Sequence, residues 1–242
     1  MLLALWSPKG GSGTSVVAAA MALVSAARQE TRLADLGGDQ PAILGLQLPP
    51  STCVPAGPSE GLAGWLTAGP STPTEWLDEM SVPVVPGLTL LPRGSATGAD
   101  RLAKEAGAAL AVSLRDEGVA VLDAGSSRGG DRGATFAAIE VADTALMVIR
   151  PCYLALRRAV ADPRLALSAG TILVEESGRA LDSSDVAAVL GVPVVARVPV
   201  RAEIARAVDA GVLRDRLPNP LAAAAAVVLD GMADAAGGCW AA

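Results

Sequence analysis

The sequence predicts an α/β protein in which one mostly parallel, twisted sheet carries helices on both faces. Two patterns predict it. Short apolar runs of strand length alternate along the chain with longer stretches of helical character. Several of these runs are apolar throughout instead of alternating apolar with polar residues, which is typical of parallel strands buried on both faces. With 242 residues, 51% of them hydrophobic, the chain can bury the core of a single domain over residues 1–242.

The first forty residues predict one β-loop-α-β unit. Residues 2–6 form a short apolar run that leads into a glycine-rich loop. Residues 15–28 follow without a helix breaker and are apolar on most sides, as expected for a helix packed against a sheet. Residues 32–36 predict a second strand, and Asp35 lies near its end. Together these elements have the size that such a unit needs.

The rest of the chain continues this alternation after an interruption. Residues 49–86 are rich in Pro, Gly, Ser and Thr, so we expect an insertion that holds one or two short helices. Further strands are predicted at residues 87–91, 119–122, 144–149, 171–174 and 194–198. Further helices are predicted at residues 99–115, 133–140, 154–161, 183–190, 202–210 and 220–232.

The composition excludes several functional classes. The chain has no histidine, which rules out Ser-His-Asp and Cys-His nucleophiles and histidine-ligated zinc. Its net charge of −6 argues against a dedicated nucleic-acid-binding protein, which needs a basic face. The three cysteines (Cys53, Cys152 and Cys239) form no CxxC pair and are odd in number, so we expect a reducing, cytoplasmic location. We expect no integral membrane segment, because the apolar runs are too short to span a bilayer.

The loop after the first predicted strand carries the strongest functional signal. Residues 7–15 read Ser-Pro-Lys-Gly-Gly-Ser-Gly-Thr-Ser. In a P-loop, glycines let backbone N–H groups approach phosphate oxygens, and the next helix points its N-terminus at the anion. Such a loop ordinarily ends in Gly-Lys-Ser or Gly-Lys-Thr. Gly13 and Ser15 fit that pattern, but Thr14 stands in the lysine position and cannot replace the lysine's charge.

The order Lys-Gly-Gly-x-Gly resembles the deviant Walker A loop of the MinD/ParA family of P-loop ATPases. This resemblance implies ATP and Mg²⁺ as cofactors. It also implies that Lys9 is the signature lysine that reaches the partner's phosphates across a nucleotide-sandwich homodimer. The nucleotide-binding loop residues that it implies are Lys9, Gly10, Gly11, Ser12, Gly13, Thr14 and Ser15.

The resemblance spans nearly the whole chain apart from residues 49–86. Asp35 matches the first aspartate of the family's Asp-x-Asp strand end, whereas Gly37 stands where the family has the aspartate that positions the attacking water. Asp123 matches the acid of the Walker B strand, and Gly125 falls in the switch II position. The metal ligands that the resemblance implies are Ser15, Asp35 and Asp123.

Loss of the P-loop lysine with retained glycines is similar to the CpaE/TadZ-type and septum-site-determining branches of the family. The resemblance therefore implies a nucleotide-dependent switch or scaffold for spatial positioning of a pilus or secretion machinery, a septum or a partition complex. We expect ATP to bind but hydrolysis to be very weak or absent, because Thr14 and Gly37 replace the residues that supply charge and an oriented water.

Two other functions stay open. One is a pseudo-ATPase that uses the same fold for protein contacts without nucleotide. The other is a dinucleotide-binding oxidoreductase, because Gly11, Gly13 and Asp35 loosely fit that fingerprint, although its third glycine is absent.

A basic cluster predicts either a partner-binding surface or an ordinary solvated face. It consists of Arg150, Arg157, Arg158 and Arg164. A patch of this kind could bind a protein, an acidic lipid or DNA, whereas Asp162 and the acidic remainder of the chain favour a solvated, balanced face. We expect protein partners from a positioning or secretion system, which would recruit the chain to a membrane or a pole.

Overall fold

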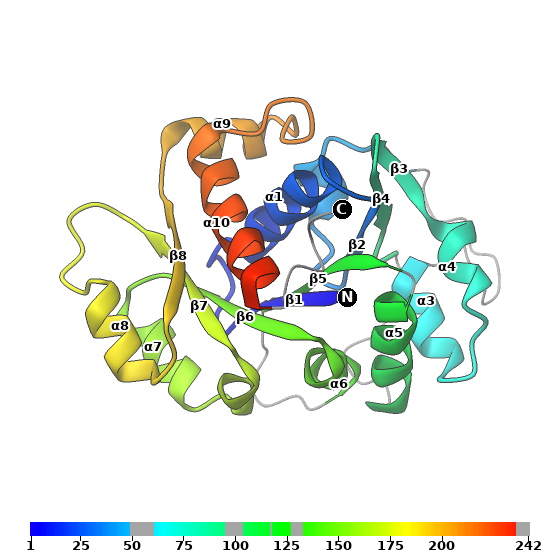
Figure 1. Ribbon diagram of the computed structural model, residues 1–242, viewed down its shortest axis with the longest axis horizontal. Coiled ribbons are helices and arrows are strands. Elements are labelled where there is room, and N and C mark those ends of the chain that lie inside the picture. The colour runs from blue at the N-terminus through cyan, green and yellow to red at the C-terminus, as the bar shows by residue number, and fades with distance from the viewer. Residues whose placement is uncertain (49–60, 95–103, 117, 127–132, 236–242) are drawn as a thin grey trace.

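In the part of the chain that the structure describes, one sheet of eight strands runs through the middle of the molecule (Figure 1). The structure is a computed structural model, and it describes residues 1–48, 61–94, 104–116, 118–126 and 133–235. The strands are β1 Leu2–Ser7, β2 Thr31–Asp35, β3 Val82–Val85, β4 Leu88–Leu91, β5 Val119–Ser126, β6 Thr144–Ile149, β7 Gly170–Glu175 and β8 Val194–Pro199. They lie in the order β3-β4-β2-β5-β1-β6-β7-β8, and every neighbouring pair is parallel except β3 with β4. The predicted fold class is confirmed.

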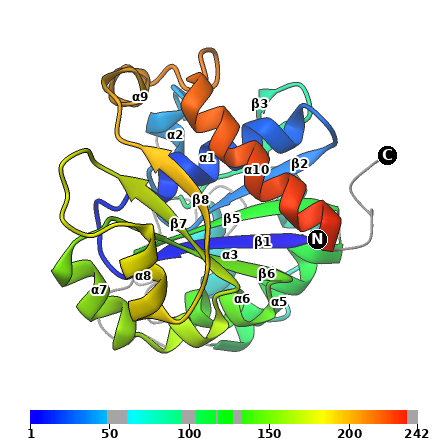
Figure 2. The same cartoon turned by 60° about the vertical axis from the view of Figure 1, so that its left-hand side comes forward.

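Helices cover both faces of this sheet, as Figures 1 and 2 show. One face carries α1 Thr14–Ala26, α2 Gln40–Ile43, α9 Ala202–Asp209 and α10 Asn219–Ala235. The other face carries α3 Gly61–Ala68, α4 Glu75–Met80, α5 Lys104–Asp116, α6 Ala134–Val141, α7 Tyr153–Val160, the 3₁₀ helix η3 Pro163–Leu167 and α8 Ser183–Leu190. Among the described residues, no helix is long and apolar enough to cross a bilayer.

The central strand β1 explains why the core has two halves. Its side chains point alternately to opposite faces of the sheet. Leu2, Ala4 and Trp6 pack into one half, and Leu3 and Leu5 pack into the other. All five are buried, because a strand between two helical layers meets water on neither side. The unbroken apolar run of this strand is therefore a consequence of its central place.

The segment predicted as an insertion contains part of the sheet. Its described part holds the two short helices α3 and α4, and it also holds β3, which pairs antiparallel with β4. β3 is one of the two edge strands of the described sheet, and Pro83 is tolerated there because one side of an edge strand makes no ladder hydrogen bonds. Residues 49–60 of this segment, the start of the predicted helix at 99–115, and two of the cysteines, Cys53 and Cys239, lie outside the described residues.

The strand order argues against the oxidoreductase hypothesis. In the dinucleotide-binding fold, β2 lies beside β1, so that the acid ending β2 reaches a ribose held by the loop after β1. Here β5 lies between β1 and β2. The spacing from Gly11 to Asp35 therefore resembles the dinucleotide fingerprint in sequence alone.

Arg164 corrects the predicted basic cluster. Its side chain is 3% exposed, and its guanidinium donates two hydrogen bonds to Asp162, with Nε–Oδ1 at 2.9 Å and Nη2–Oδ2 at 3.2 Å. The same group lies 5.4 Å from the centre of the Trp6 ring. Asp162 also caps η3 by accepting from the Arg164 N–H, and this tight turn directs the arginine inward. The exposed members of the cluster are Arg150, Arg157 and Arg158.

Candidate functional site

The glycine-rich loop between β1 and α1 forms an open cradle. Gly11 and Gly13 have φ values of 77° and 91°, a left-handed region in which other residues are strained. The Ser12 hydroxyl donates to the Lys9 carbonyl at 2.7 Å and stabilises the turn. Gly13 is the N-cap of α1 and has no side chain to accept from the first-turn N–H groups. These N–H groups and the positive end of the helix dipole are thus available to an anion.

A pocket of roughly 570 Å³ lies over this loop. Its volume is in the range of small-molecule sites. The loop side of the lining comprises Ser7, Gly10, Gly11, Ser12, Gly13, Thr14, Ser15 and Val16. The opposite side comprises Gly37, Asp39, Ala42, Ile43, Gly125, Ser126 and Val208. Among the described lining residues, Asp39 alone has a charged side chain, so the cradle would hold an anion mainly through neutral hydrogen-bond donors.

Seven of the ten predicted site residues line the pocket: Gly10, Gly11, Ser12, Gly13, Thr14, Ser15 and Gly125. The other three are Lys9, Asp35 and Asp123. Lys9 is turned back on its own loop, where its ammonium lies 3.5 Å from the Gly10 carbonyl oxygen. The two acids lie behind the wall of the pocket and are 0% exposed.

Asp35 and Asp123 are brought together by the pairing of β2 with β5, in which they are register partners. Burial raises the pKa of Asp35 to about 7, and repulsion from the Asp123 carboxylate adds to the shift. Burial also raises the pKa of Asp123, although hydrogen bonds from Gln40 and Ser15 oppose that shift. Two carboxyl groups this deeply buried resist being charged together. The pair therefore retains a proton up to about neutral pH.

All four carboxylate oxygens of this pair accept hydrogen bonds from the protein. Asp35 accepts from the backbone N–H groups of Gly38 at 2.6 Å and Gln40 at 3.1 Å. Asp123 accepts from the Gly125 N–H at 3.0 Å and from Gln40 Nε2 at 2.8 Å. The two acids thus fix the loop after β2, the first residue of α2 and the end of β5.

The backbone of Gly37 lies against the Asp123 carboxylate. A Cβ atom at this position would lie 3.1 Å from Asp123 Oδ2, which is tighter than ordinary packing. A Cβ at Gly125 would in turn lie 3.1 Å from the Gly37 Cα. The loop after β2 and the last residues of β5 therefore touch backbone to backbone beside the Asp123 carboxylate. An aspartate at position 37, which the sequence resemblance associates with this place, would therefore crowd the Asp123 carboxylate unless that carboxylate shifted by a few tenths of an ångström.

The three implied metal ligands do not fit Mg²⁺ in this arrangement. Mg²⁺ needs oxygen ligands in near-ideal octahedral geometry at about 2.0–2.1 Å and retains several waters. Asp35 and Asp123 are fully buried, their oxygens accept protein hydrogen bonds, and neither lines the pocket that Ser15 lines. The structure thus supports an anion cradle next to a closed acid pair.

Two residues of the site are not predicted from the sequence. Gln40 contacts both acids and also donates to the Ser15 carbonyl at 2.9 Å. Arg93, at the end of β4, donates to the Leu36 carbonyl and so ties a third strand to the loop after β2. The signals available in the sequence are an amide directly before Pro41 at a helix start and an arginine two positions after a buried strand.

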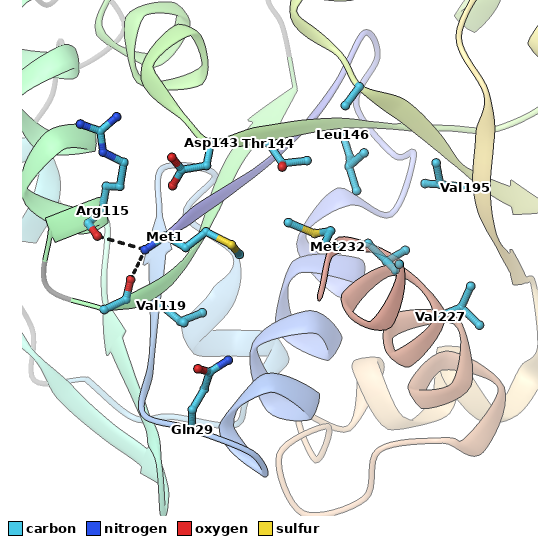
Figure 3. Close-up of a pocket in the computed structure, with 14 residues that line it drawn as sticks. Met1, Gln29, Arg115, Val119, Asp143, Thr144, Leu146, Val195, Val227 and Met232 are labelled. Carbon is cyan, nitrogen blue, oxygen red and sulfur yellow. Dashed lines mark hydrogen bonds between the residues drawn. The ribbon is translucent and has the colours of Figure 1, made fainter. Parts of the chain in front are cut away.

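A larger cavity than the cradle pocket lies at the opposite end of the sheet, where the strands begin. Figure 3 shows it between the amino ends of β1, β5, β6 and β8 and the last turns of α10. It has roughly 900 Å³, and its lining includes Leu146, Val195, Val227 and Met232. It shares no residue with the glycine-rich cradle and has no comparable anion-binding loop. The cradle is therefore the candidate site for a phosphate ligand.

The sequence matches no family model and no curated protein. Solved structures do match it. The ParA family ATPase from Chlorobium tepidum is 19% identical and has a TM-score of 0.73, and the match covers 93% of this chain and 96% of that one. MinD in the MinC:MinD cell division complex of Aquifex aeolicus is 18% identical, with a TM-score of 0.72 over 96% and 95% of the two chains.

A third similar structure is the septum site-determining protein MinD from Pyrococcus horikoshii, solved with Mg-ADP. It is 16% identical and has a TM-score of 0.72, and the match covers 98% of this chain and 97% of that one. At such identities the likeness establishes the fold and nothing finer. The eight-stranded, mostly parallel sheet with its glycine-rich loop after β1 is the MinD/ParA type of P-loop NTPase fold.

Proposed function

We propose that this chain is a nucleotide-binding switch or scaffold of a spatial positioning system, with very weak or absent ATP hydrolysis. The open cradle over Gly11 and Gly13 is the observation that supports nucleotide binding, because it offers backbone donors and a helix N-terminus to phosphate oxygens. The proposed ligand is ATP or ADP.

Weak hydrolysis follows from what the pocket lacks. A lysine contact to a phosphate is worth about 1.5–3 kcal/mol as a charge-assisted hydrogen bond, or about one to two orders of magnitude in affinity. Thr14 cannot supply it. Gly37 supplies no carboxylate to orient a water, and its backbone covers Asp123 instead. Binding survives the loss of one contact better than phosphoryl transfer, which depends on charge stabilisation and an oriented nucleophile.

The positioning role is proposed from the similar structures. Two of them are cell division proteins, one in complex with MinC, and another is a ParA family ATPase. By analogy we propose a homodimer and a protein partner for this chain, with a septum, a partition complex or a pilus or secretion machinery as the object positioned. The degenerate loop supports, by resemblance, the proposal of a CpaE/TadZ-like or septum-site-determining branch.

A pseudo-ATPase without nucleotide is the second candidate. One observation favours it: among the described residues that line the cradle, the only charged side chain is the acidic Asp39. The negative charge of a triphosphate would therefore be repelled by Asp39, and no lysine among these lining residues would offset that repulsion. Exposed arginines on and beside α7 (Arg150, Arg157 and Arg158) would then serve a protein contact.

Calorimetric titration of the chain with ATP and with ADP tests the proposal. We expect measurable binding that Gly13→Ala weakens at least about tenfold, because the left-handed turn of the cradle becomes strained. Gly191→Ala is the matched control: Gly191 also has a positive φ, of 69°, but follows α8 away from the cradle. If the chain binds neither nucleotide, the pseudo-ATPase without nucleotide is the remaining candidate function. Rapid phosphate release that persists in Asp123→Ala would contradict the site assignment.

A further inference from the structure

Gln40 joins the three parts of the candidate site. It is the first residue of α2, directly after the exposed loop 37–39, yet its side chain is 0% exposed. Its backbone N–H donates to Asp35, and its side-chain Nε2 donates to Asp123 Oδ2 at 2.8 Å and to the Ser15 carbonyl at 2.9 Å. One residue thus connects both buried acids to the first turn of the P-loop helix.

The orientation of this amide is determined by its partners. The Ser15 carbonyl can only accept a hydrogen bond, and in a glutamine side chain only Nε2 carries hydrogens. Both Nε2 hydrogens are engaged, one by Ser15 and one by Asp123. Oε1 is buried without a hydrogen-bond partner among the described residues. An unpaired buried acceptor destabilises the fold, so the two donated bonds must offset that cost.

The amide nitrogen therefore lies between the Ser15 carbonyl and Asp123 Oδ2, and the Ser15 hydroxyl, the group that would bind a cation on the phosphates, is itself hydrogen-bonded to Asp123. A cation entering from the pocket would have to displace Gln40, break its two hydrogen bonds and expose Asp123. The backbone of Gly37 closes the other approach, since even a Cβ there would lie 3.1 Å from Asp123 Oδ2. Gln40 donates a hydrogen bond to Asp123 Oδ2, at the place where a cation would supply positive charge.

We propose that Gln40 replaces the divalent cation at this site, so that the pocket takes a nucleoside phosphate as the metal-free anion. The ligand class in this inference rests on the proposed function, whereas the exclusion of the cation does not. The phosphate charge is then met by the loop N–H groups and by the hydroxyls of Thr14 and Ser126, which line the pocket.

The exclusion of the cation is tested without nucleotide. Mn²⁺ binding to the purified chain is followed by electron paramagnetic resonance. The wild type should show no Mn²⁺ site that depends on Asp123, and Gln40→Ala should acquire one that Asp123→Asn abolishes. Gln40→Met keeps the length of the side chain without its donors and serves if the alanine variant fails to fold. Gln29→Ala is the matched control, because Gln29 lies beyond the far end of α1 at the other cavity.

The ligand form is tested by titrating ADP with excess Mg²⁺ and with EDTA. The wild type and Gln29→Ala should bind equally well in both, within about twofold, and Gln40→Ala should bind at least about tenfold tighter with Mg²⁺. A wild-type Mn²⁺ site lost in Asp123→Asn, or a tenfold Mg²⁺ dependence of the wild type, would overturn the inference. If ADP binds under neither condition, the proposed function fails, and the Mn²⁺ measurement still decides whether Gln40 excludes the cation.

Discussion

Asp35 and Asp123 face each other across the β2–β5 pair as register partners, and neither exposes any surface to water. Their oxygens accept hydrogen bonds from the backbone N–H groups of Gly38, Gln40 and Gly125. The acid pair is thus a structural element of the site, and its protonation is tied to the stability of the fold.

The first prediction concerns pH. Because folding raises the pKa of Asp35 from 3.8 to about 7, the folded chain holds a proton between these values that the unfolded chain has lost. Stability conferred by this group is therefore present at low pH and falls as the pH rises toward 7, by up to about 1.4 kcal/mol per unit. Urea unfolding should give a larger free energy at pH 5 than at pH 8.

Asp35→Asn should flatten this pH dependence, because the variant carries no proton to lose at that position. Exposed Asp234, near the end of α10, provides the control: Asp234→Asn should keep the wild-type slope. A free energy of unfolding that rises steadily from pH 5 to pH 8 in the wild type would contradict the assignment of a raised pKa.

The second prediction concerns Gly37. Restoring an aspartate there should not restore hydrolysis and should destabilise the fold by about 1–3 kcal/mol, because the new Cβ would crowd Asp123 Oδ2. Gly37→Ala should be destabilising for the same steric reason. In Gly231→Ala the added Cβ meets no atom within 4 Å, and that helical position should gain about 0.5–1 kcal/mol. Thermal unfolding and phosphate release measure both effects.

The third prediction concerns the missing lysine. Thr14 lines the pocket, so Thr14→Lys should place an ammonium against bound phosphates and tighten ATP binding about tenfold or more. Thr14→Met adds a chain of similar bulk without charge and should not tighten binding. The comparison is made by calorimetry, and equal affinities for all three chains would show that the loop does not cradle phosphates.

The fourth prediction concerns Arg164. Removing it leaves the buried Asp162 carboxylate unpaired and uncovers one face of Trp6, so Arg164→Ala should cost about 3–5 kcal/mol in unfolding free energy. Arg158→Ala, on the exposed face of α7, should change it by less than about 0.5 kcal/mol. Chemical denaturation distinguishes the two variants. Similar losses of unfolding free energy in both would show that Arg164 is a surface residue.

The fifth prediction concerns the proposed homodimer. Lys9 is turned to its own loop and does not line its own pocket, which leaves its ammonium available to a partner's ligand. Sedimentation velocity should show a dimer that forms with nucleotide and is lost in Lys9→Ala. Lys104→Ala is the control, because Lys104 lies over the Phe136 ring, at 5.5 Å from its centroid. A wild-type monomer with and without nucleotide would refute the role of Lys9.

The sequence predicts most of the sheet because the central strands are buried on both faces and are apolar without interruption, as in β1. It does not predict β3, since Val82–Val85 contains a proline within a Pro-rich stretch, and only pairing with β4 makes it a strand. The helix α2 is a single short turn that hydrogen bonds to Asp35 hold in place, and no periodicity signals it.

The sequence predicts those residues of the candidate site that lie at the ends of predicted strands. The glycine-rich loop and the two acids are visible in this way, whereas Gln40 is not, because Asp123 lies 83 positions further along the chain. Arg164 is predicted wrongly although its ion-pair partner Asp162 is two positions away, because its packing over the Trp6 ring of β1 is not visible in the sequence. Contacts between distant segments decide whether such a side chain lies on the surface or in the core.

The contact of Gly37 with Gly125 has a mechanical consequence. Because neither residue has a side chain, no flexible group lies between the two loops to absorb a displacement. Movement of the segment after β2 would therefore push the last residues of β5, and Arg93 extends this linkage to the segment after β4. A ligand that shifts one of these three strand ends would therefore move the other two as well. A partner bound to these strand ends would then respond to the bound ligand without contacting it.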